Sequence, residues 1–402
     1  MRIAVHDYAG HPFAFDLTRT LAARGHVARH FFFAGDPGPK GNSERAPDDP
    51  EGFSIAPLNV SGTYDKSKLV TRLKLDRAYG AVAAKAIAGF RPDVVISGNT
   101  PLDAQARLLA ASRGGGAAFV FWMQDMISPL IMAQIGGRWR GLGRLIALRY
   151  QRLERRLVRR SDAAVLISDD FADEAEALGM RPRSVSVISN WGALDAIPTR
   201  PRDNRWAAAH GYAEGITILY SGTLGAKHNP LMLVDLADAL ADRADVRIVI
   251  AGGGVGLTQI QAELARKARP NIRVEAFQPV EDFPDMLGAA DILLALLEKD
   301  AGRFCVPSKI LSYLCAGRPI LLASPPENQG ATVIAQAGAG IVVDAGDSAG
   351  LIAAARALID DPARRADTGA KGRAYAQRTF ELERVADRFE SAIAAALVNR
   401  RS

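Results

Sequence analysis

Short apolar runs alternate with amphipathic helical patterns along nearly the whole chain. In the first half the runs occupy residues 1–8, 28–35, 93–99, 117–125, 163–168 and 185–189, and in the second half residues 216–222, 246–254, 272–277, 291–297, 318–324 and 340–346. Strands that are apolar on both faces and alternate with helices are typical of parallel sheets covered on both sides. The pattern therefore predicts doubly wound α/β architecture, in which ligands bind beyond the carboxyl ends of the strands.

The length of the chain indicates two domains. A chain of 402 residues is too long for one ordinary hydrophobic core. The stretch 195–206 is rich in Pro, Arg, Asp and Asn and poor in apolar residues, so it is the best linker in the sequence. We therefore expect an N-terminal domain over residues 1–198 and a C-terminal domain over residues 199–375.

Composition favours a globular protein of the cytoplasm. Hydrophobic residues make up 48% of the chain and charged residues 23%. The N-terminus lacks the apolar segment of a secretory signal, and no apolar stretch approaches the roughly 18 residues of a membrane span. The two cysteines, Cys305 and Cys315, have neither a disulfide framework nor a zinc spacing, so we expect reduced thiols.

One segment is strongly basic. Residues 138–160 contain nine arginines and one glutamate, with apolar residues recurring near helical spacing. Such a basic amphipathic helix suits an anionic membrane surface, where each basic residue contributes about 1 kcal/mol. The alternative is a helix packed on the core with a solvated basic side. Nucleic acid is not favoured, because aromatic residues do not interleave with the arginines and no binding motif is present.

Two segments have the pattern expected of a phosphate site. In residues 220–230 a strand leads through a Gly-containing turn into a helix whose early turns carry Lys227, and in residues 306–323 a helix opens near Pro307 and Ser308 and carries Lys309. A helix N-terminus offers unpaired backbone N–H groups, and a nearby lysine adds a point charge. The two segments together could bind one diphosphate.

Several ordered blocks carry a resemblance to a known family. They are HDYAGHPFAFDLTRTLAARGH, SGNTPLDAQ, FVFWMQDM, SDAAVLISDDF, VISNWGALD, SGTLGAKHNP and VPSKILSYLCAGRPI. The chain resembles GT-B retaining glycosyltransferases of the family 4 type, and more narrowly the bacterial O-antigen and colanic-acid fucosyl- or N-acetylfucosaminyltransferases. The resemblance implies two Rossmann-like domains facing across a cleft, with the nucleotide-sugar donor on the C-terminal domain and the acceptor on the N-terminal one. It also implies a C-terminal helix, residues 376–402, that packs back on the N-terminal domain.

The resemblance assigns residues to the donor diphosphate. Lys227 matches the family's phosphate lysine, although a solvated helix residue is the alternative. The family usually has an arginine shortly before that lysine, and this chain has Thr223 there. Lys309 and Arg303 are the candidates for the missing charge, and Ser308 with the helix-start N–H groups adds donors.

A second departure concerns the family's paired glutamates, which contact the donor sugar and the ribose. The alignment places Phe304 and Ser312 at these positions. Ser312 offers one hydrogen bond to a ribose hydroxyl, and the alternative for it is an ordinary helix-surface role. Phe304 cannot accept such a bond, so backbone groups from Phe304 through Val306 to Pro307 are expected to line the sugar site.

Glycines and two residues after a strand complete the expected donor site. Gly10, Gly222 and Gly252 follow or end strands, where a glycine lets the backbone approach a nucleotide. The run AGGGVG lacks the spacing of a dinucleotide fingerprint, so a turn near the nucleotide is favoured over NAD binding. Phe277 and Gln278 lie where relatives hold the base by backbone contacts.

Four residues of the first domain are further candidates, His11 and Asn99 for the acceptor and Gln124 and Asp125 for catalysis. His11 follows the first strand and would contact acceptor or diphosphate, with a packed loop histidine as the alternative. Gln124 and Asp125 stand where relatives have His-Asp facing the C6 hydroxyl of the donor sugar, and an amide there is compatible with a 6-deoxy sugar. Asn99 and Asp125 orient the acceptor hydroxyl or serve as turn caps.

We therefore expect transfer of a sugar with retention from a UDP- or GDP-linked donor to a lipid-linked or saccharide acceptor of a surface polysaccharide. In that mechanism the departing phosphate takes the acceptor proton, so no protein nucleophile is needed, and two lysines make a metal unnecessary. The enzyme would work at the inner face of the plasma membrane. The alternatives are a sugar-nucleotide 2-epimerase of the same fold and a noncatalytic nucleotide-binding subunit.

Overall fold

The chain folds into two compact units, seen here in a computed structural model that describes residues 1–36, 40–60, 69–135, 141–177, 179, 183–225, 228–299 and 308–401. The first unit comprises Met1–Asn190 and Leu382–Ser402, and the second comprises Trp191–Glu381. Each unit is built on one sheet. The doubly wound α/β architecture predicted from the sequence is confirmed.

The first unit contains a parallel sheet in the order β3-β2-β1-β4-β5-β6-β7. Its strands are β1 (Arg2–Asp7), β2 (Val27–Phe33), β3 (Phe53–Leu58), β4 (Val94–Gly98), β5 (Ala118–Met123), β6 (Ala163–Leu166) and β7 (Val185–Val187). The chain runs from β1 outward to β3 and then continues from β4 on the other side of β1. The switch point of this sheet therefore lies between β1 and β4, where a ligand site is expected.

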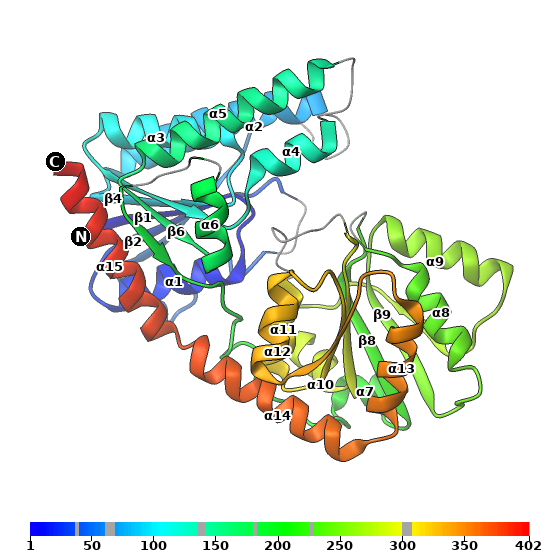
Figure 1. The fold of residues 1–402 in the computed structure, drawn as a ribbon. Coiled ribbons are helices and arrows are strands. Elements are labelled where there is room, and N and C mark those ends of the chain that lie inside the picture. Colours follow the sequence, from blue (N-terminus) through cyan, green and yellow to red (C-terminus); the bar gives the residue numbers. More distant parts are fainter. Residues whose placement is uncertain are drawn as a thin grey trace. The chain divides into compact units, whose positions relative to one another are not determined.

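Helices cover both faces of the first sheet. They are α1 (Pro12–Ala23), α2 (Leu69–Phe90), α3 (Leu102–Gly114), α4 (Ile127–Ile135), α5 (Leu142–Arg160), α6 (Asp169–Ala177) and α15 (Leu382–Arg401). Figure 1 shows α2, α3 and α5 on one face and α1 and α15 on the other. Under α15, the Trp122 ring lies edge-on to Phe389, with ring centroids 5.0 Å apart. Burial of such aromatic rings joins the C-terminal helix to the core of the first unit.

One arginine at the end of α1 forms ion pairs with α15. The Arg24 guanidinium donates to the carboxylates of Glu383, Asp387 and Glu390 at 2.6 to 2.9 Å, and to the Glu383 backbone carbonyl at 2.7 Å. His26 also contacts Glu390, at 2.9 Å. These ion pairs join segments that are far apart in sequence. The acidic side chains of α15 therefore help to fix the position of this helix on the first unit.

The second unit contains a parallel sheet in the order β10-β9-β8-β11-β12-β13. Its strands are β8 (Ile216–Thr223), β9 (Val246–Gly253), β10 (Ile272–Glu275), β11 (Ile292–Leu296), β12 (Ile320–Ala323) and β13 (Gly340–Val343). Its switch point lies between β8 and β11. The glycines that end β8 and β9 are therefore next to the expected ligand position.

Two layers of helices cover this second sheet. The helices are α7 (Arg205–Ala209), α8 (Leu231–Ala239), α9 (Val255–Arg266), α10 (Phe283–Gly288), α11 (Ser308–Ala316), α12 (Gln329–Ala337), α13 (Ser348–Ile359) and α14 (Pro362–Thr379). In Figure 1, α8, α9 and α13 lie on one face, and α10, α11, α12 and α14 lie on the other. The core under the first group is aliphatic, from Ile248 and Ile250 of β9 to Leu351 and Leu358 of α13.

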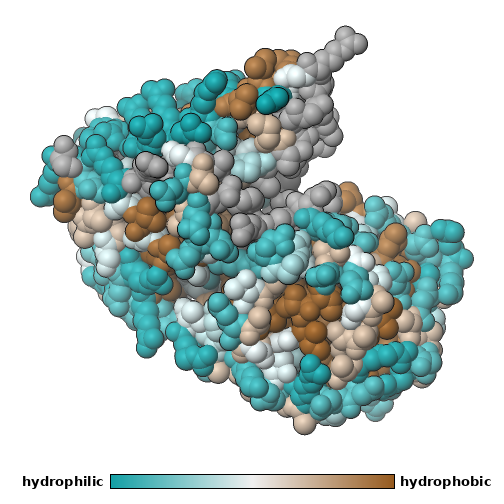
Figure 2. Space-filling model, in the orientation of Figure 1, coloured by the Kyte–Doolittle hydropathy of each residue, from teal (hydrophilic) through white to brown (hydrophobic). Residues whose placement is uncertain are grey.

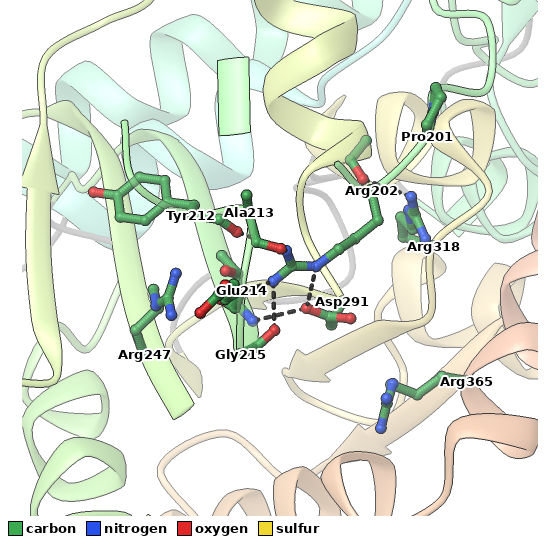
Figure 3. A network of polar contacts seen from close by, with 12 residues as sticks. Pro201, Arg202, Tyr212, Ala213, Glu214, Gly215, Arg247, Asp291, Arg318 and Arg365 are labelled. Atoms are coloured by element: carbon green, nitrogen blue, oxygen red, sulfur yellow. Dashed lines mark hydrogen bonds and ion pairs between the residues drawn. The ribbon is translucent and has the colours of Figure 1, made fainter. Parts of the chain in front are cut away.

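The segment that the sequence indicates as a linker is bound to the amino-terminal edge of the second sheet. Figure 3 shows the Arg202 guanidinium between the Asp291 carboxylate and backbone carbonyls of residues 212–215. The same Asp291 carboxylate accepts the backbone N–H of Thr217 at 2.9 Å. Arg318 likewise donates to backbone carbonyls. Because these arginines bind backbone groups, they stabilise the fold. They lie at the edge of the sheet opposite the expected ligand position.

Two expectations about helices need correction. The helix expected to carry Lys227 in its early turns is α8, and it begins only at Leu231. The stretch 376–402, expected as one helix, comprises the end of α14 and a separate helix α15, with a break at Phe380 and Glu381. Among the described residues, no helix has the length and apolar character needed to cross a membrane.

Candidate functional site

The candidates of the first domain gather at the switch point of the first sheet. His11 follows β1, Asn99 follows β4, and Gln124 and Asp125 follow β5, so all four lie at carboxyl ends of neighbouring strands. Gly10, in the turn before His11, has φ +74°, which favours glycine, and its carbonyl accepts the N–H of Gly41. This turn bends the chain from β1 into α1.

A hydrogen-bonded cluster joins three of these residues to Asp7, the last residue of β1. The buried Asp7 carboxylate accepts the backbone N–H of His11 at 2.6 Å and lies 3.0 and 3.2 Å from the His11 Nδ1 atom. The Asn99 amide donates to Asp7 Oδ1 at 2.8 Å and to Gln124 Oε1 at 2.7 Å. Asn99 has φ +47°, a conformation that Asn tolerates better than most residues. The structure therefore brings His11, Asn99 and Gln124 together.

Asp7 and His11 shift each other's pKa. Burial alone would raise the pKa of the Asp7 carboxyl, but the charge of His11 and hydrogen bonds from His11 and Asn99 hold that pKa well below its ordinary value. Burial lowers the pKa of the His11 ring, yet the charges of Asp7, Asp125 and Asp36 and the bond to Asp7 raise it above the ordinary value overall. The pair is thus a carboxylate beside a histidine that readily binds a proton.

A second polar layer lies beneath the cluster. The buried His6 ring contacts Ser97 Oγ at 3.0 Å, Tyr79 Oη at 2.8 Å and Thr100 Oγ1 at 3.1 Å, and Ser97 Oγ donates to Gln105 Oε1 at 2.7 Å. Burial lowers the pKa of His6 to about 4, so this ring is neutral at physiological pH. The layer fixes the ends of β1 and β4 that carry the cluster.

The only acidic residue of the basic segment 138–160 supports the loop that carries Gln124 and Asp125. Glu154 of α5 is fully buried, and its two carboxylate oxygens accept the backbone N–H groups of Ile127 and Ser128, each at 2.9 Å. These N–H groups begin α4 directly after the loop. Glu154 therefore supplies the acceptors that the start of α4 lacks within its own chain segment.

Lys309 is the central donor-side candidate among the described residues. It lies in the first turn of α11, and its Nζ atom is 3.7 Å from the centre of the Tyr220 ring of β8. This atom is buried and has no hydrogen-bond partner in the described part of the chain. Burial lowers the pKa of the Lys309 ammonium to about 7. A buried amine with unused donors is costly for the empty protein, so an anionic ligand at this position would relieve an unfavourable arrangement.

Gly222 and Gly252 form a close contact beside this lysine. They are register partners on β8 and β9. A Cβ atom at Gly252 would lie 2.1 Å from the Gly222 carbonyl oxygen, and a Cβ atom at Gly222, where φ is +109°, would lie 3.8 Å from Lys309 Nζ. The two glycines therefore leave backbone accessible at the carboxyl edge, next to the Lys309 ammonium.

The other described donor-side candidates lie along the same edge. Thr223 ends β8 and is exposed, and Ser308 and Ser312 lie one turn apart on α11, where Ser308 is exposed. Phe277 is 57% exposed and lies across Gly253, whereas Gln278 accepts the indole N–H of Trp206 through its side chain at 2.8 Å. The Gln278 amide nitrogen donates to the Ala276 carbonyl. Both ends of this side chain therefore have partners, and a ligand would be held by backbone groups of Gln278.

Five predicted site residues lie outside the described residues. They are Lys227, Arg303, Phe304, Val306 and Pro307. Their assigned roles stay predictions.

Three residues that help to build the two candidate sites do not appear among the sequence-based candidates. Asp7 and Tyr220 lie inside apolar runs that indicate only strands, and Glu154 is masked by the arginines around it. The signal available for Asp7 is its position at the end of β1, four residues before His11. A buried carboxylate at a strand end is uncommon unless it is paired.

Both halves of the chain match models of known families. Residues 10–191 match the glycosyl transferase 4-like domain, and residues 215–361 match glycosyl transferases group 1. A curated relative is the GDP-mannose-dependent monoacylated alpha-(1-6)-phosphatidylinositol monomannoside mannosyltransferase of Corynebacterium glutamicum, 27% identical over 218 residues. That match covers 53% of this chain and 56% of the relative, so it spans about half the length of each.

Solved structures of similar fold include Anabaena HepE in complex with UDP, with TM-score 0.68, 15% identity, and coverage of 98% of this chain and 100% of that one. Another is WaaG, a glycosyltransferase involved in lipopolysaccharide biosynthesis, with TM-score 0.67, 17% identity, and coverage of 96% and 99%. At these identities the likeness shows the fold alone, and it confirms the two-domain fold expected from the sequence.

Proposed function

We propose that this chain, which belongs to the GT-B glycosyltransferases of the group 4 and group 1 type, transfers a sugar with retention from a UDP- or GDP-linked donor to a lipid-linked or saccharide acceptor of a surface polysaccharide. The observation that carries the proposal is Lys309, a buried amine without a partner among the described residues, at the switch point of the second sheet. The mannosyltransferase of Corynebacterium glutamicum is GDP-mannose-dependent and the HepE structure contains UDP, and both facts are consistent with such a donor.

The donor diphosphate would bind at the carboxyl edge of the second sheet. Lys309 and Lys227 supply positive charge to the departing phosphates, and Ser308 with the N-terminal N–H groups of α11 adds hydrogen-bond donors. Arg303 adds a further charge, and Thr223 lines the site without supplying one. Charge stabilisation of the leaving group is the main demand of glycosyl transfer, so these groups would act as catalytic residues.

The nucleoside and sugar would extend from the diphosphate along the same edge. Phe277 and the backbone of Gln278 are placed to hold the base, Ser312 to hold a ribose hydroxyl, and the close pair Gly222 and Gly252 to admit the phosphates. The segment from Phe304 through Val306 to Pro307 would line the sugar. The role expected of Gly10 towards a diphosphate stays a prediction.

The acceptor would bind at the cluster of His11, Asn99 and Gln124 in the first unit. Asp125 lies exposed beside it, and its charge acts on His11. Gln124 in place of the family's histidine is compatible with a 6-deoxy donor sugar, which has a methyl group where others have a hydroxyl. A measured preference for glucose or mannose donors over fucose-type donors would contradict this part of the proposal.

A screen of nucleotide sugars tests the proposed activity. At about 100 times its dissociation constant, the true donor should stabilise the protein by about 2.7 kcal/mol, seen as a rise in melting temperature. Transfer should then be measured with that donor and lipid-linked saccharides. Turnover of the donor to its 2-epimer without acceptor would instead identify an epimerase. Binding of the donor without any turnover would identify a noncatalytic subunit.

We expect transfer to persist in EDTA, because lysines supply the charge that a metal would otherwise supply. Complete loss of transfer that Mg²⁺ restores would refute the metal-free mechanism.

We also propose that the hairpin of α4 and α5 places the enzyme on the inner face of the plasma membrane. One side of α5 packs on the unit through Ala147, Tyr150 and Leu157, and several of its arginines point to solvent. At the start of α5, Leu142 and Leu145 are 54% and 65% exposed. Figure 2 shows hydrophobic colour gathered at that end of the first unit. Exposed leucines beside a row of arginines suit the interface of an anionic bilayer.

Vesicle sedimentation tests this placement. The protein should sediment with vesicles containing phosphatidylglycerol at low salt and be released at high salt, because the attraction is screened. The double variant Leu142→Ser, Leu145→Ser should reduce the bound fraction that survives added salt. As a matched control, Val255→Ser alters a residue of α9 that is 61% exposed and should leave binding unchanged. Equal sedimentation with neutral phosphatidylcholine vesicles would exclude an electrostatic membrane site.

A further inference from the structure

We propose that the second half of α5 is a binding site for neighbouring phosphate groups, such as those of a diphosphate. Among the described residues, the site is formed by five arginines that line one hollow in the surface of the first unit: Arg152, Arg155, Arg156, Arg159 and Arg160. The inference rests on the first unit alone and does not depend on the proposed glycosyl transfer.

The spacing of these arginines places them on one side of the helix. They stand at positions i, i+3, i+4, i+7 and i+8 of α5, so each lies beside the next on the same face. The opposite face carries Leu157 and Val158, which are buried in the first unit. Because that face is packed, α5 is held in one rotation about its axis. The fold therefore holds the five guanidinium groups around one hollow of about 320 Å³.

The helix itself supplies no carboxylate to neutralise this charge. Glu154 is the only acidic residue of α5, and it lies on the buried side, where both its oxygens accept backbone N–H groups of α4 at 2.9 Å. Like charges at these helical spacings repel one another. An anion in the hollow would therefore relieve an unfavourable arrangement. Four of the five arginines are exposed and form no ion pair with any residue that the structure describes: Arg152, Arg156, Arg159 and Arg160.

Stabilisation of the helix by its own dipole explains only part of the pattern. Arg159 and Arg160 lie in the last turn of α5, where a positive charge interacts favourably with the helix C-terminus. This effect falls off within one turn, so it does not account for the arginines further back along the hollow. The last carbonyls also have other donors, because Arg113 donates to the Arg160 carbonyl at 2.7 Å and Ser161 Oγ to the Leu157 carbonyl at 2.9 Å.

The chemistry of the hollow selects phosphate groups. A guanidinium presents its N–H donors in a planar fork that fits two oxygens of a phosphate. A diphosphate offers several such oxygens and more than one negative charge in a small volume, which suits several forks side by side. The described residues that line the hollow include no aromatic side chain on which a nucleobase could stack. The site therefore favours the phosphate groups themselves over a base.

These phosphate groups could belong to a soluble diphosphate or to lipid headgroups that lie side by side in a bilayer. The membrane placement proposed above depends on Leu142 and Leu145 at the start of α5. The hollow begins at Arg152, about 10 Å further along the helix than Leu145. Both sources present the same chemistry to the arginines, and experiments can separate them.

Calorimetric titration with sodium pyrophosphate at low salt tests the site. The double variant Arg156→Gln, Arg159→Gln should weaken binding in the hollow by about tenfold or more, because it removes two charge-assisted contacts. The matched control is Arg144→Gln, Arg149→Gln, which removes the same charge from exposed positions of α5 outside the hollow. The control should bind nearly as wild type does. Equal affinity in the two double variants would mean that pyrophosphate responds only to overall charge, and the inference would be wrong.

The proposed donor site of the second unit also takes a diphosphate, so the two sites must be told apart. Wild type should show two classes of pyrophosphate site, of which Lys309→Met loses one and Arg156→Gln, Arg159→Gln the other. If Lys309→Met abolishes all pyrophosphate binding, the hollow is not a phosphate site, while the proposed function stands. If Lys309→Met changes nothing and the double arginine variant abolishes binding, the inference stands and the donor site loses its support.

Vesicles of equal parts phosphatidylcholine and phosphatidylglycerol identify the source of the phosphate groups. The variant Leu142→Ser, Leu145→Ser serves as background, because it removes the exposed leucines. If lipid headgroups are the ligand, adding Arg156→Gln, Arg159→Gln should lower the sedimented fraction further, and pyrophosphate should release the protein better than chloride of the same ionic strength. If a soluble diphosphate is the ligand, the added substitutions should lower pyrophosphate affinity alone. A quadruple variant unchanged in both measurements would overturn the inference.

Discussion

Lys309→Met should weaken binding of the donor diphosphate by about 100-fold or more. The Lys309 ammonium is buried against the Tyr220 ring and has unused hydrogen-bond donors, so a diphosphate would meet it in a site with little water. Truncating one partner of a buried, hydrogen-bonded charge pair typically costs 2–5 kcal/mol, and about 2.7 kcal/mol corresponds to 100-fold. Methionine keeps an unbranched chain of similar length, so the loss would report the charge.

Calorimetric titration with UDP and GDP measures this effect. Lys267→Met is a suitable control, because Lys267 of the same unit is 66% exposed and pairs with Asp238. The control should bind as wild type does. Unchanged affinity in Lys309→Met would remove Lys309 from the diphosphate site and leave the donor-side proposal without its main observation.

The same substitution should have the opposite effect on the stability of the empty protein. The pKa of Lys309 is about 7 in the folded chain and about 10.4 when unfolded. Between these values the unfolded chain holds a proton that the folded chain lacks, so wild-type stability rises with pH across this window. Below pH 7 the charged, buried ammonium destabilises the fold. Lys309→Met should therefore be more stable there, by about 1–3 kcal/mol, and the difference should vanish near pH 10.

Denaturant unfolding at several pH values measures this difference. If Lys309→Met gains stability and loses affinity for the diphosphate, the role of Lys309 is to bind that ligand and not to stabilise the fold. A purely structural lysine would show neither the gain at low pH nor the loss of binding. If Lys309→Met were less stable than wild type at every pH, burial of the ammonium would not be a cost, and the lowered pKa would be wrong.

The strand pattern could be predicted from the sequence almost completely, because each buried strand is a short apolar run with clear ends. The exception is β3, whose sequence FSIAPL contains Pro57 and alternates with polar or small residues. Proline lacks a backbone N–H and weakens the prediction of a strand. In the structure β3 is the edge strand of its sheet, with Pro57 beside Phe32, and an edge is where a proline is tolerated.

The candidate site could be predicted only in part. Residues that follow strands, such as His11, Asn99 and Gln124, are recognisable because parallel strands bring their carboxyl ends to one edge. Their partner Asp7 is not, since its role depends on burial and on contacts 92 residues away in sequence. The environment of Lys309 is likewise unpredictable from local sequence. Its lowered pKa arises from burial, and within the described part of the chain its ammonium lies over the Tyr220 ring, far away in sequence on β8.

Gly252→Ala should lower the free energy of unfolding of the second unit by about 3–4 kcal/mol. A Cβ atom there would lie 2.1 Å from the carbonyl oxygen of Gly222, and the positions of both atoms are set by backbone that neighbouring strands hold in register. No side chain can rotate to relieve this overlap, so β8 and β9 would have to separate. Overpacking of this kind costs about 1–3 kcal/mol and more where backbone must move.

Gly253→Ala provides the matched comparison one residue along. Its Cβ atom would meet Phe277 at 3.0 Å, and that ring is 57% exposed and able to turn away. We expect a loss of less than about 1 kcal/mol. Chemical denaturation of both variants measures the difference. Equal stability of the two would mean that β8 and β9 separate easily at their carboxyl ends, and that the edge where the diphosphate is proposed to bind is not a rigid backbone platform.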